Sequence, residues 1–292
     1  MNAWQPWPPA DGRDHSVTGR ILHLGALETA LLGNQRDVWV CLPSGYESGS
    51  ARYPVLYMQD GQNLFDRAIG FSGQEWSVDE TLAAEAGRAD AIVVGIANTG
   101  VHRLEEYSPF RDNRMGGGKG EAYLDFVVDV VKPLVDAGFR TLVGRDDTFI
   151  GGSSMGALIS LHAFLTRPHV FGGVAALSPA LWFAQRAIFD VVAAAPFTNG
   201  RVYIDIGTRE GPVQLLDVAR LRNRMVHKGY RKGENLLVVV EGGGRHNEAA
   251  WARRFPRALR FLLRVREPVE WDRGGRPGSS RTRALRRMRR RE

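Results

Sequence analysis

A glycine- and serine-rich stretch in the middle of the chain has the composition and spacing of a nucleophile site. It reads FIGGSSMGAL, and Gly152, Ser154 and Gly156 within it match the G-x-S-x-G pattern of a nucleophile elbow. An elbow lies between a strand and a helix, and the apolar residues 148–150 and the helical pattern over 155–166 predict both. A strand-to-helix connection without chemistry is the alternative, but this context favours Ser154 as a nucleophile.

A serine nucleophile needs a base and an acid that orients the base. Where the nucleophile lies on an elbow between a strand and a helix, the acid and the base lie on loops after later strands. His246 comes directly after the last apolar run, in the loop sequence EGGGRHNE, whereas His227 falls inside a helical pattern. We therefore predict that His246 is the base. Glu210 follows the preceding apolar run and is the favoured acid. Asp205, within that run, is the second choice, and Asp217, within the next helical pattern, is the third.

Acyl transfer also requires two backbone N–H donors for the oxyanion. The residue after an elbow nucleophile supplies one, which here is Met155. The second is expected from the loop after the third predicted strand, where a buried strand ends in the polar sequence QDGQNLFD. We predict the N–H of Gln62 in that loop as the second donor.

Strands and helices alternate along the chain in a way that positions these residues. The predicted strands are 17–24, 38–42, 55–58, 91–96, 148–150, 173–177, 202–206 and 236–240. The predicted helices are 77–86, 123–134, 155–166, 213–228 and 248–263. From the third run onward the strands are continuously apolar, which is typical of parallel strands covered on both faces. We predict one doubly wound α/β domain with a mostly parallel sheet of about eight strands.

The positive charge of the chain lies at one end of it. The net charge is +7, and residues 273–292 contain nine arginines and one glutamate, a net of +8, so residues 1–272 carry 7 − 8 = −1. We predict an N-terminal surface extension (1–15), a hydrolase domain (16–268) and a basic, disordered tail (269–292). We interpret the tail as a segment that increases solubility. The alternative is that it binds nucleic acid or an acidic surface. We expect no nucleic-acid binding by the domain itself.

Several other kinds of site are excluded by the residues present. Cys41 is the only cysteine, so the chain has no cysteine-based metal cluster, and Lys119 in GGGKG is followed by Gly120 rather than the Ser or Thr of a phosphate loop. We expect no catalytic metal and no cofactor. No apolar run reaches the length of a membrane span, and the N-terminus has no signal pattern, so we expect a cytoplasmic protein without a membrane partner. The sequence does not indicate an oligomeric state.

Taken together, these motifs resemble the putative-esterase branch of the α/β-hydrolases, which includes siderophore, feruloyl and acetylxylan esterases, esterase D and the mycolyltransferases. The stretches that carry the resemblance are VLYMQDGQNLFD (55–66), GGSSMGALISL (151–161), YIDIGTREG (203–211) and HNEAAWARRFPRALRFL (246–262). The resemblance implies an α/β-hydrolase fold, and we expect no separate cap domain.

The resemblance also implies roles for individual residues. It assigns nucleophile, acid and base to Ser154, Glu210 and His246, and oxyanion donors to Gln62 and Met155. A stretch RLEEYSPF that begins at Arg103 is similar to a family loop along the substrate cleft. The residues expected to line that cleft are Asp60, Arg103, Tyr107 and Trp251.

The predicted function is hydrolysis of a carboxylic ester through an acyl-enzyme, with a small-molecule siderophore, aromatic or acyl-sugar ester as substrate. Transfer of the acyl group to an alcohol by the same triad is an alternative. A catalytically silent hydrolase-like protein with a polyanion-binding tail is another. The sequence identifies neither the acyl part nor the alcohol part of the substrate.

Overall fold

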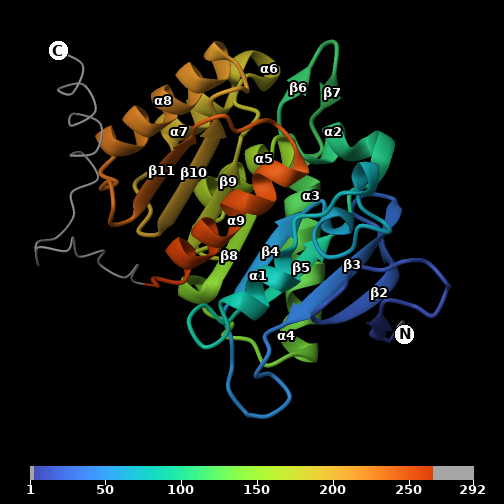
Figure 1. Ribbon diagram of the computed structural model, residues 1–292. Helices are drawn as coiled ribbons and strands as arrows, with labels where there is room; N and C mark the ends of the chain where they lie inside the picture. The colour runs from blue at the N-terminus through green and yellow to red at the C-terminus, as the bar shows by residue number, and fades with distance from the viewer. Residues whose placement is uncertain (1–2, 266–292) are drawn as a thin grey trace, which may run out of the picture.

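The structure, a computed structural model, describes residues 3–265 and is built around one large sheet (Figure 1). The strands of this sheet are β1 (Gln5–Trp7), β2 (Arg20–Thr29), β3 (Asn34–Leu42), β4 (Val55–Gln59), β5 (Ile92–Ile96), β8 (Thr148–Ser153), β9 (Gly173–Leu177), β10 (Arg201–Gly207) and β11 (Leu236–Glu241). Two short strands, β6 (Arg111–Asp112) and β7 (Gly116–Gly117), form a separate hairpin.

The helices connect successive strands. They are α1 (Val78–Ala84), α2 (Arg103–Glu106), α3 (Gly120–Phe126), α4 (Lys132–Gly138), α5 (Met155–Thr166), α6 (Phe183–Arg186), α7 (Ile188–Ala194), α8 (Pro212–His227) and α9 (Glu248–Leu262). A π-helical stretch, Val127–Val131, joins α3 to α4, so the predicted helix 123–134 lies within one continuous helical segment.

The strand order among residues 3–265 is β1-β2-β3-β5-β4-β8-β9-β10-β11. The strands from β5 to β11 in this order are parallel, whereas β1, β2 and β3 join antiparallel at one side. Because the carboxyl ends of parallel strands meet at one edge, the loops after β4, β8, β10 and β11 come together there. These loops contain the predicted site residues.

Two hydrophobic cores flank the sheet, and they explain the continuously apolar strands. In β5, Val94 faces the core formed with α3, α4, α5, α7 and α8, whereas Val93 faces the core formed with α1 and α9. Figure 1 shows α1 and α9 together on the near face of the sheet, with α5 behind it. Both faces of each central strand are thus covered, as the sequence pattern predicts.

The predicted fold class is confirmed, and each predicted strand and helix overlaps one in the structure. The sheet has nine strands among the described residues rather than about eight, because residues 5–7 of the predicted extension pair with β2. The side chain of Trp7 donates to Asp66 over 3.0 Å and anchors this segment. Helices α2, α6 and α7 and the β6–β7 hairpin were not predicted, since each is too short to show a periodic pattern. The predicted basic tail lies outside the described residues.

No helix among residues 3–265 combines the length and the apolar character that crossing a membrane would require.

Candidate active site

The backbone at Ser154 has the strained geometry of an elbow. Strand β8 ends at Ser153 and α5 begins at Met155, and Ser154 between them has φ 55° and ψ −117°. This region is unfavourable for a residue with a Cβ and is found where the surroundings enforce it. The enforcing contacts are backbone hydrogen bonds: the N–H of Ser154 donates to Leu177, and its carbonyl accepts from Ala180, both over 3.0 Å.

The two glycines of the motif are required by the neighbouring strand. A Cβ added at Gly152 or at Gly156 would lie 2.9 Å from the Cβ of Gln59, the last residue of β4. No real Cβ tolerates such a contact without a shift of backbone. The G-x-S-x-G spacing therefore lets β8 and α5 pack closely against β4, which sets the position of Ser154 at the edge of the sheet.

Glu210 and His246 are brought into direct contact although they lie on different loops. Nδ1 of His246 is 2.8 Å from Oε2 of Glu210. The Glu210 side chain is 2% exposed, whereas that of His246 is 45% exposed, so the carboxylate is fixed inside and the imidazole faces out. The ring of His246 also packs edge-on against Trp251, with centroids 5.0 Å apart.

The carboxylate of Glu210 is held in its ionised form. Burial would raise its pKa, but hydrogen bonds from His246, from the Ser178 hydroxyl and from the Gly207 N–H outweigh burial and hold the pKa below its usual range. The Ser178 Oγ donates over 2.7 Å and the Gly207 N–H over 2.8 Å, both to Oε1. A buried acceptor with this many donors presents its other oxygen to His246 in one orientation.

Ser178 and Arg254 complete this network, and the sequence analysis missed both. The hydroxyl of Ser178 accepts from Trp251 Nε1 over 3.0 Å and from Arg254 Nη2 over 2.9 Å while it donates to Glu210. Ser178 lies in the loop after β9 whose residues hold the backbone of Ser154, so the elbow and the acid share one support. A lone serine after a strand and one arginine among many in α9 have no pattern that marks them in advance.

The two alternative acids are engaged elsewhere. Asp205 is buried within β10, accepts from the Ser178 N–H and the Tyr203 hydroxyl, both over 3.1 Å, and has no hydrogen bond to His246 among the described residues. Burial raises its pKa to about 7, in spite of nearby Arg254. Asp217 in α8 pairs with Arg186 over 2.9 Å. Of the three candidates, Glu210 is the one in contact with His246.

No hydrogen bond joins the Ser154 hydroxyl to His246 within residues 3–265. Hydrogen bonds between a nucleophile and its base are often long without substrate and tighten in the Michaelis complex. Among the described residues the imidazole has its hydrogen bond at Nδ1, so Nε2 is available to an incoming group.

The loop after β4 carries the predicted oxyanion donor and is held by a carboxylate. Asp60, at φ 57°, accepts from both Nε and Nη2 of Arg103 over 2.8 and 2.9 Å and from the Asn98 side chain over 2.7 Å. The Asn98 N–H in turn donates to the side chain of Gln62 over 3.2 Å. The backbone N–H groups of Gln62 and Met155 have no acceptor among the described residues, as an oxyanion site requires.

The four residues expected to line the substrate cleft divide into two groups. Arg103 keeps a 26% exposed side chain beside Asp60. Burial would lower the pKa of Arg103, but the Asp60 carboxylate raises it. Tyr107 is fully buried, with its hydroxyl accepting from the Asp60 N–H over 3.0 Å, and Trp251 is 6% exposed. These two aromatic side chains support Asp60 and His246, and Asp60 itself is only 5% exposed. That the four residues line the substrate cleft stays a prediction.

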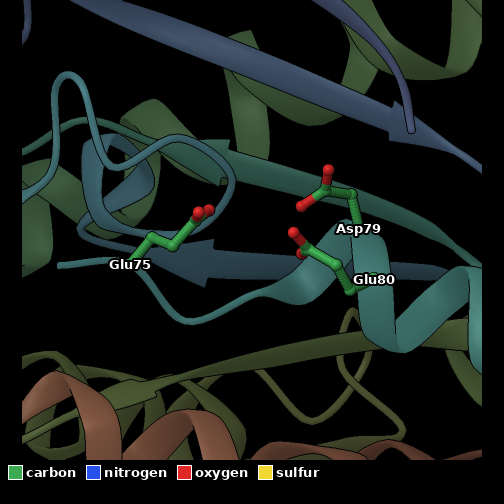
Figure 2. Close-up of side chains that lie close together, drawn as sticks. All are labelled: Glu75, Asp79 and Glu80. Carbon is green, nitrogen blue, oxygen red and sulfur yellow. The ribbon is translucent and has the colours of Figure 1, made fainter. Parts of the chain in front are cut away.

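One group of carboxylates among residues 3–265 could hold a cation. Oxygen atoms of Glu75, Asp79 and Glu80 lie within 4.8 Å of one another. Figure 2 shows these three side chains close together. Asp79 also accepts from the N–H groups of Thr18 and Gly19 over 2.7 and 3.1 Å, which ties that segment to the first turn of α1. No hydrogen bond links the three carboxylates to Ser154, Glu210 or His246 in this part of the chain, so the cluster is separate from the reaction proposed below.

Comparison with known proteins agrees with this geometry. Residues 29–262 match the family model described as "Putative esterase". The chain is 25% identical to the uncharacterized protein YbbA of Bacillus subtilis over 251 residues, 82% of this chain and 96% of that one. It is 27% identical to the siderophore triacetylfusarinine C esterase of Aspergillus fumigatus over 155 residues, 51% of each chain.

A solved structure shows the same fold. An IroE-like serine hydrolase from Shewanella oneidensis superposes with a TM-score of 0.67 at 19% identity, over 84% of this chain and 80% of that one. Because the family model covers most of the chain, from residue 29 to residue 262, the protein belongs to the Putative esterase family with an α/β-hydrolase fold and is a serine hydrolase of carboxylic esters.

Proposed function

We propose that Ser154, His246 and Glu210 are the catalytic triad of this esterase. The observation that carries the proposal is the 2.8 Å contact between His246 Nδ1 and the buried carboxylate of Glu210. Ser178 links that carboxylate to the loop whose backbone holds the strained Ser154. Nucleophile, base and acid thus converge on one edge of the sheet, each from a loop after a different strand.

In the first half of the reaction, Nε2 of His246 takes the hydroxyl proton of Ser154 as Oγ attacks the ester carbonyl carbon. The carbonyl π electrons move to oxygen, and the N–H groups of Gln62 and Met155 stabilise the oxyanion. Glu210 accepts from Nδ1–H and stabilises the imidazolium. The C–O bond to the alcohol then breaks, and the leaving alcohol takes the proton from His246, which leaves an acyl-Ser154.

In the second half, His246 removes a proton from water, and the hydroxide attacks the acyl carbon. The second oxyanion collapses with release of the carboxylic acid, and Ser154 regains its proton from His246. An alcohol in place of water would give acyl transfer by the same steps.

The substrate class proposed is an ester-linked siderophore. Its support is the similarity to the Aspergillus fumigatus siderophore esterase, which extends over 51% of both chains. Aromatic and acyl-sugar esters are the competing classes. The cytoplasmic location stays a prediction.

A serine-directed fluorophosphonate probe tests the proposed nucleophile. It should label the wild-type protein and Ser153→Ala but not Ser154→Ala. Labelling of Ser154→Ala would reject the assignment, and a wild-type protein that resists the probe would favour a catalytically silent protein. A panel of p-nitrophenyl, feruloyl, acetyl-sugar and siderophore esters then ranks the substrate classes by kcat/KM, and the siderophore class is rejected if another is preferred by tenfold or more.

A further inference from the structure

A cavity lies at the edge of the sheet opposite Ser154. Its volume is about 590 Å³, and its walls include residues at the amino ends of the parallel strands and the last two turns of α9. Gly172 precedes β9, Arg201 begins β10 and Asn235 precedes β11, so the cavity lies where these strands start. This volume is typical of small-molecule sites in proteins.

The charge of this cavity is strongly positive. Five arginines line it, namely Arg201, Arg231, Arg257, Arg260 and Arg264. Two of them are neutralised locally, since Arg231 pairs with Glu234 over 2.9 Å and Arg260 pairs with Glu85 over 2.7 Å. The remaining acid of the wall, Asp146, is paired with Arg145 over 2.7 Å.

The other three guanidinium groups have no hydrogen-bond acceptor or carboxylate partner in the described part of the chain. Arg201, Arg257 and Arg264 make no side-chain hydrogen bond or ion pair within residues 3–265. For Arg257 and Arg264, which are exposed, water can satisfy the donors. Arg201 is different, because it is 8% exposed, its Nε is buried without an acceptor, and its guanidinium lies 5.2 Å from the ring centroid of Phe149.

An unpaired buried guanidinium is energetically unfavourable. Burial, with a further contribution from nearby Arg264, lowers the pKa of Arg201 to about 10, against the weaker opposing effect of the Asp146 and Asp147 carboxylates. The five N–H donors of arginine match the oxygens of phosphate and carboxylate groups. Since Arg257 and Arg264 line the same cavity as Arg201, the group that best satisfies these three cations carries two negative charges.

We propose that this cavity binds a phosphomonoester dianion, with the phosphate held by Arg201, Arg257 and Arg264. The apolar side chains of Leu237, Phe261 and Val265 also line the cavity and would contact the organic part of the ligand. The site is separate from the esterase site, because it lies at the opposite ends of the same strands.

Calorimetric titration of the full-length protein with phenyl phosphate at low salt tests this proposal. Wild type should bind, and phenyl phosphate should raise its Tm. Arg201→Gln and, independently, Arg257→Gln should weaken binding by about tenfold or more, since each removes hydrogen bonds to a charged group. Arg257 is exposed on α9, so its variant keeps the test valid if Arg201→Gln does not fold. Arg222→Gln, a partly exposed arginine of α8 outside the cavity, is the matched control and should bind as wild type does.

Three outcomes would overturn the proposal. One is the absence of phenyl phosphate binding to wild type at millimolar concentration. Another is unchanged affinity in folded Arg201→Gln and Arg257→Gln, which would place binding elsewhere, at the Ser154 site or the arginines of residues 273–292. The third is benzoate, with a single charge, binding as tightly as phenyl phosphate. Binding is measured without ester hydrolysis, so these outcomes do not depend on the proposed triad.

Discussion

The two edges of the parallel sheet treat their charged groups in opposite ways. At the carboxyl edge, Glu210 accepts from His246, Ser178 and the Gly207 N–H, and Asp60 accepts from Arg103 and Asn98. At the amino edge, Arg201 is buried with no side-chain acceptor among residues 3–265. This difference indicates different functions for the two edges. A catalytic site holds its charged groups in position before the substrate binds, whereas the unpaired charges of a binding site are neutralised by the ligand.

The largest effect expected at the carboxyl edge is that of Ser154→Ala. Ester turnover should fall by roughly 10⁴-fold or more, since the members of a triad act as a unit and the acyl-enzyme cannot form. Steady-state kinetics with p-nitrophenyl acetate measure this, with Ser153→Ala as the control, because that serine ends β8 and has no role in the mechanism. Near-normal turnover by Ser154→Ala would show that Ser154 is not the nucleophile and that the reaction does not take place at this edge.

The next effect distinguishes the two carboxylates of the β10 segment. Glu210→Gln should lower kcat/KM by about 10²–10⁴-fold, because an amide N–H in place of Oε2 would face the Nδ1–H of His246 and favour the wrong tautomer. Asp205→Asn should cost less than about tenfold, since Asp205 contacts Ser178 and Tyr203 rather than His246. The opposite ranking of these two variants would make Asp205 the acid.

Asp205 should instead affect stability, with a pH dependence of defined sign. An unfolded aspartate ionises near about pH 3.9, whereas the folded protein raises the pKa of Asp205 to about 7. Between these values the folded state binds more protons, so the contribution of Asp205 to the free energy of unfolding is lost as pH rises. From pH 5 to pH 7 wild type should lose about 2 kcal/mol relative to Asp205→Asn.

Urea denaturation of both proteins at the two pH values measures this difference. A wild-type curve that runs parallel to that of the variant across this range would mean that Asp205 is already ionised in the fold.

The smallest effect on turnover is expected from removal of the basic C-terminal segment. Truncation after Val269 removes the arginines of residues 273–292. Turnover of a small neutral ester should stay within about twofold of wild type, because the triad and the predicted oxyanion donors lie within residues 3–265 and solvent-exposed charge acts through weak, screened fields. Loss of activity, measured with p-nitrophenyl acetate, would show that the removed segment contacts the carboxyl edge and that the two edges are not independent.

Local sequence patterns were sufficient to predict most of the fold. Continuously apolar runs such as 91–96 mark strands covered on both faces, and an i, i+3, i+4 stripe marks the helix around Tyr123. The elbow was predictable as well, because close packing against Gln59 excludes any side chain at Gly152 and Gly156. The family match then confirmed the esterase activity that these motifs predicted. Strand β1 was missed, since three residues paired only at a sheet edge carry no periodic signal.

By itself the sequence determined the fold class, the order of the elements and the short set of residues that could react, because these depend on local spacing and hydrophobic period. Only the tertiary structure decided which carboxylate meets His246, since Asp205 lies within β10 and Glu210 only five positions further along, just after its end. It also decided that Tyr107 and Trp251 are buried supports and that Ser178 and Arg254 join the network. Contacts of this kind join residues far apart in the chain, and their geometry is set by how the layers pack rather than by any neighbouring sequence.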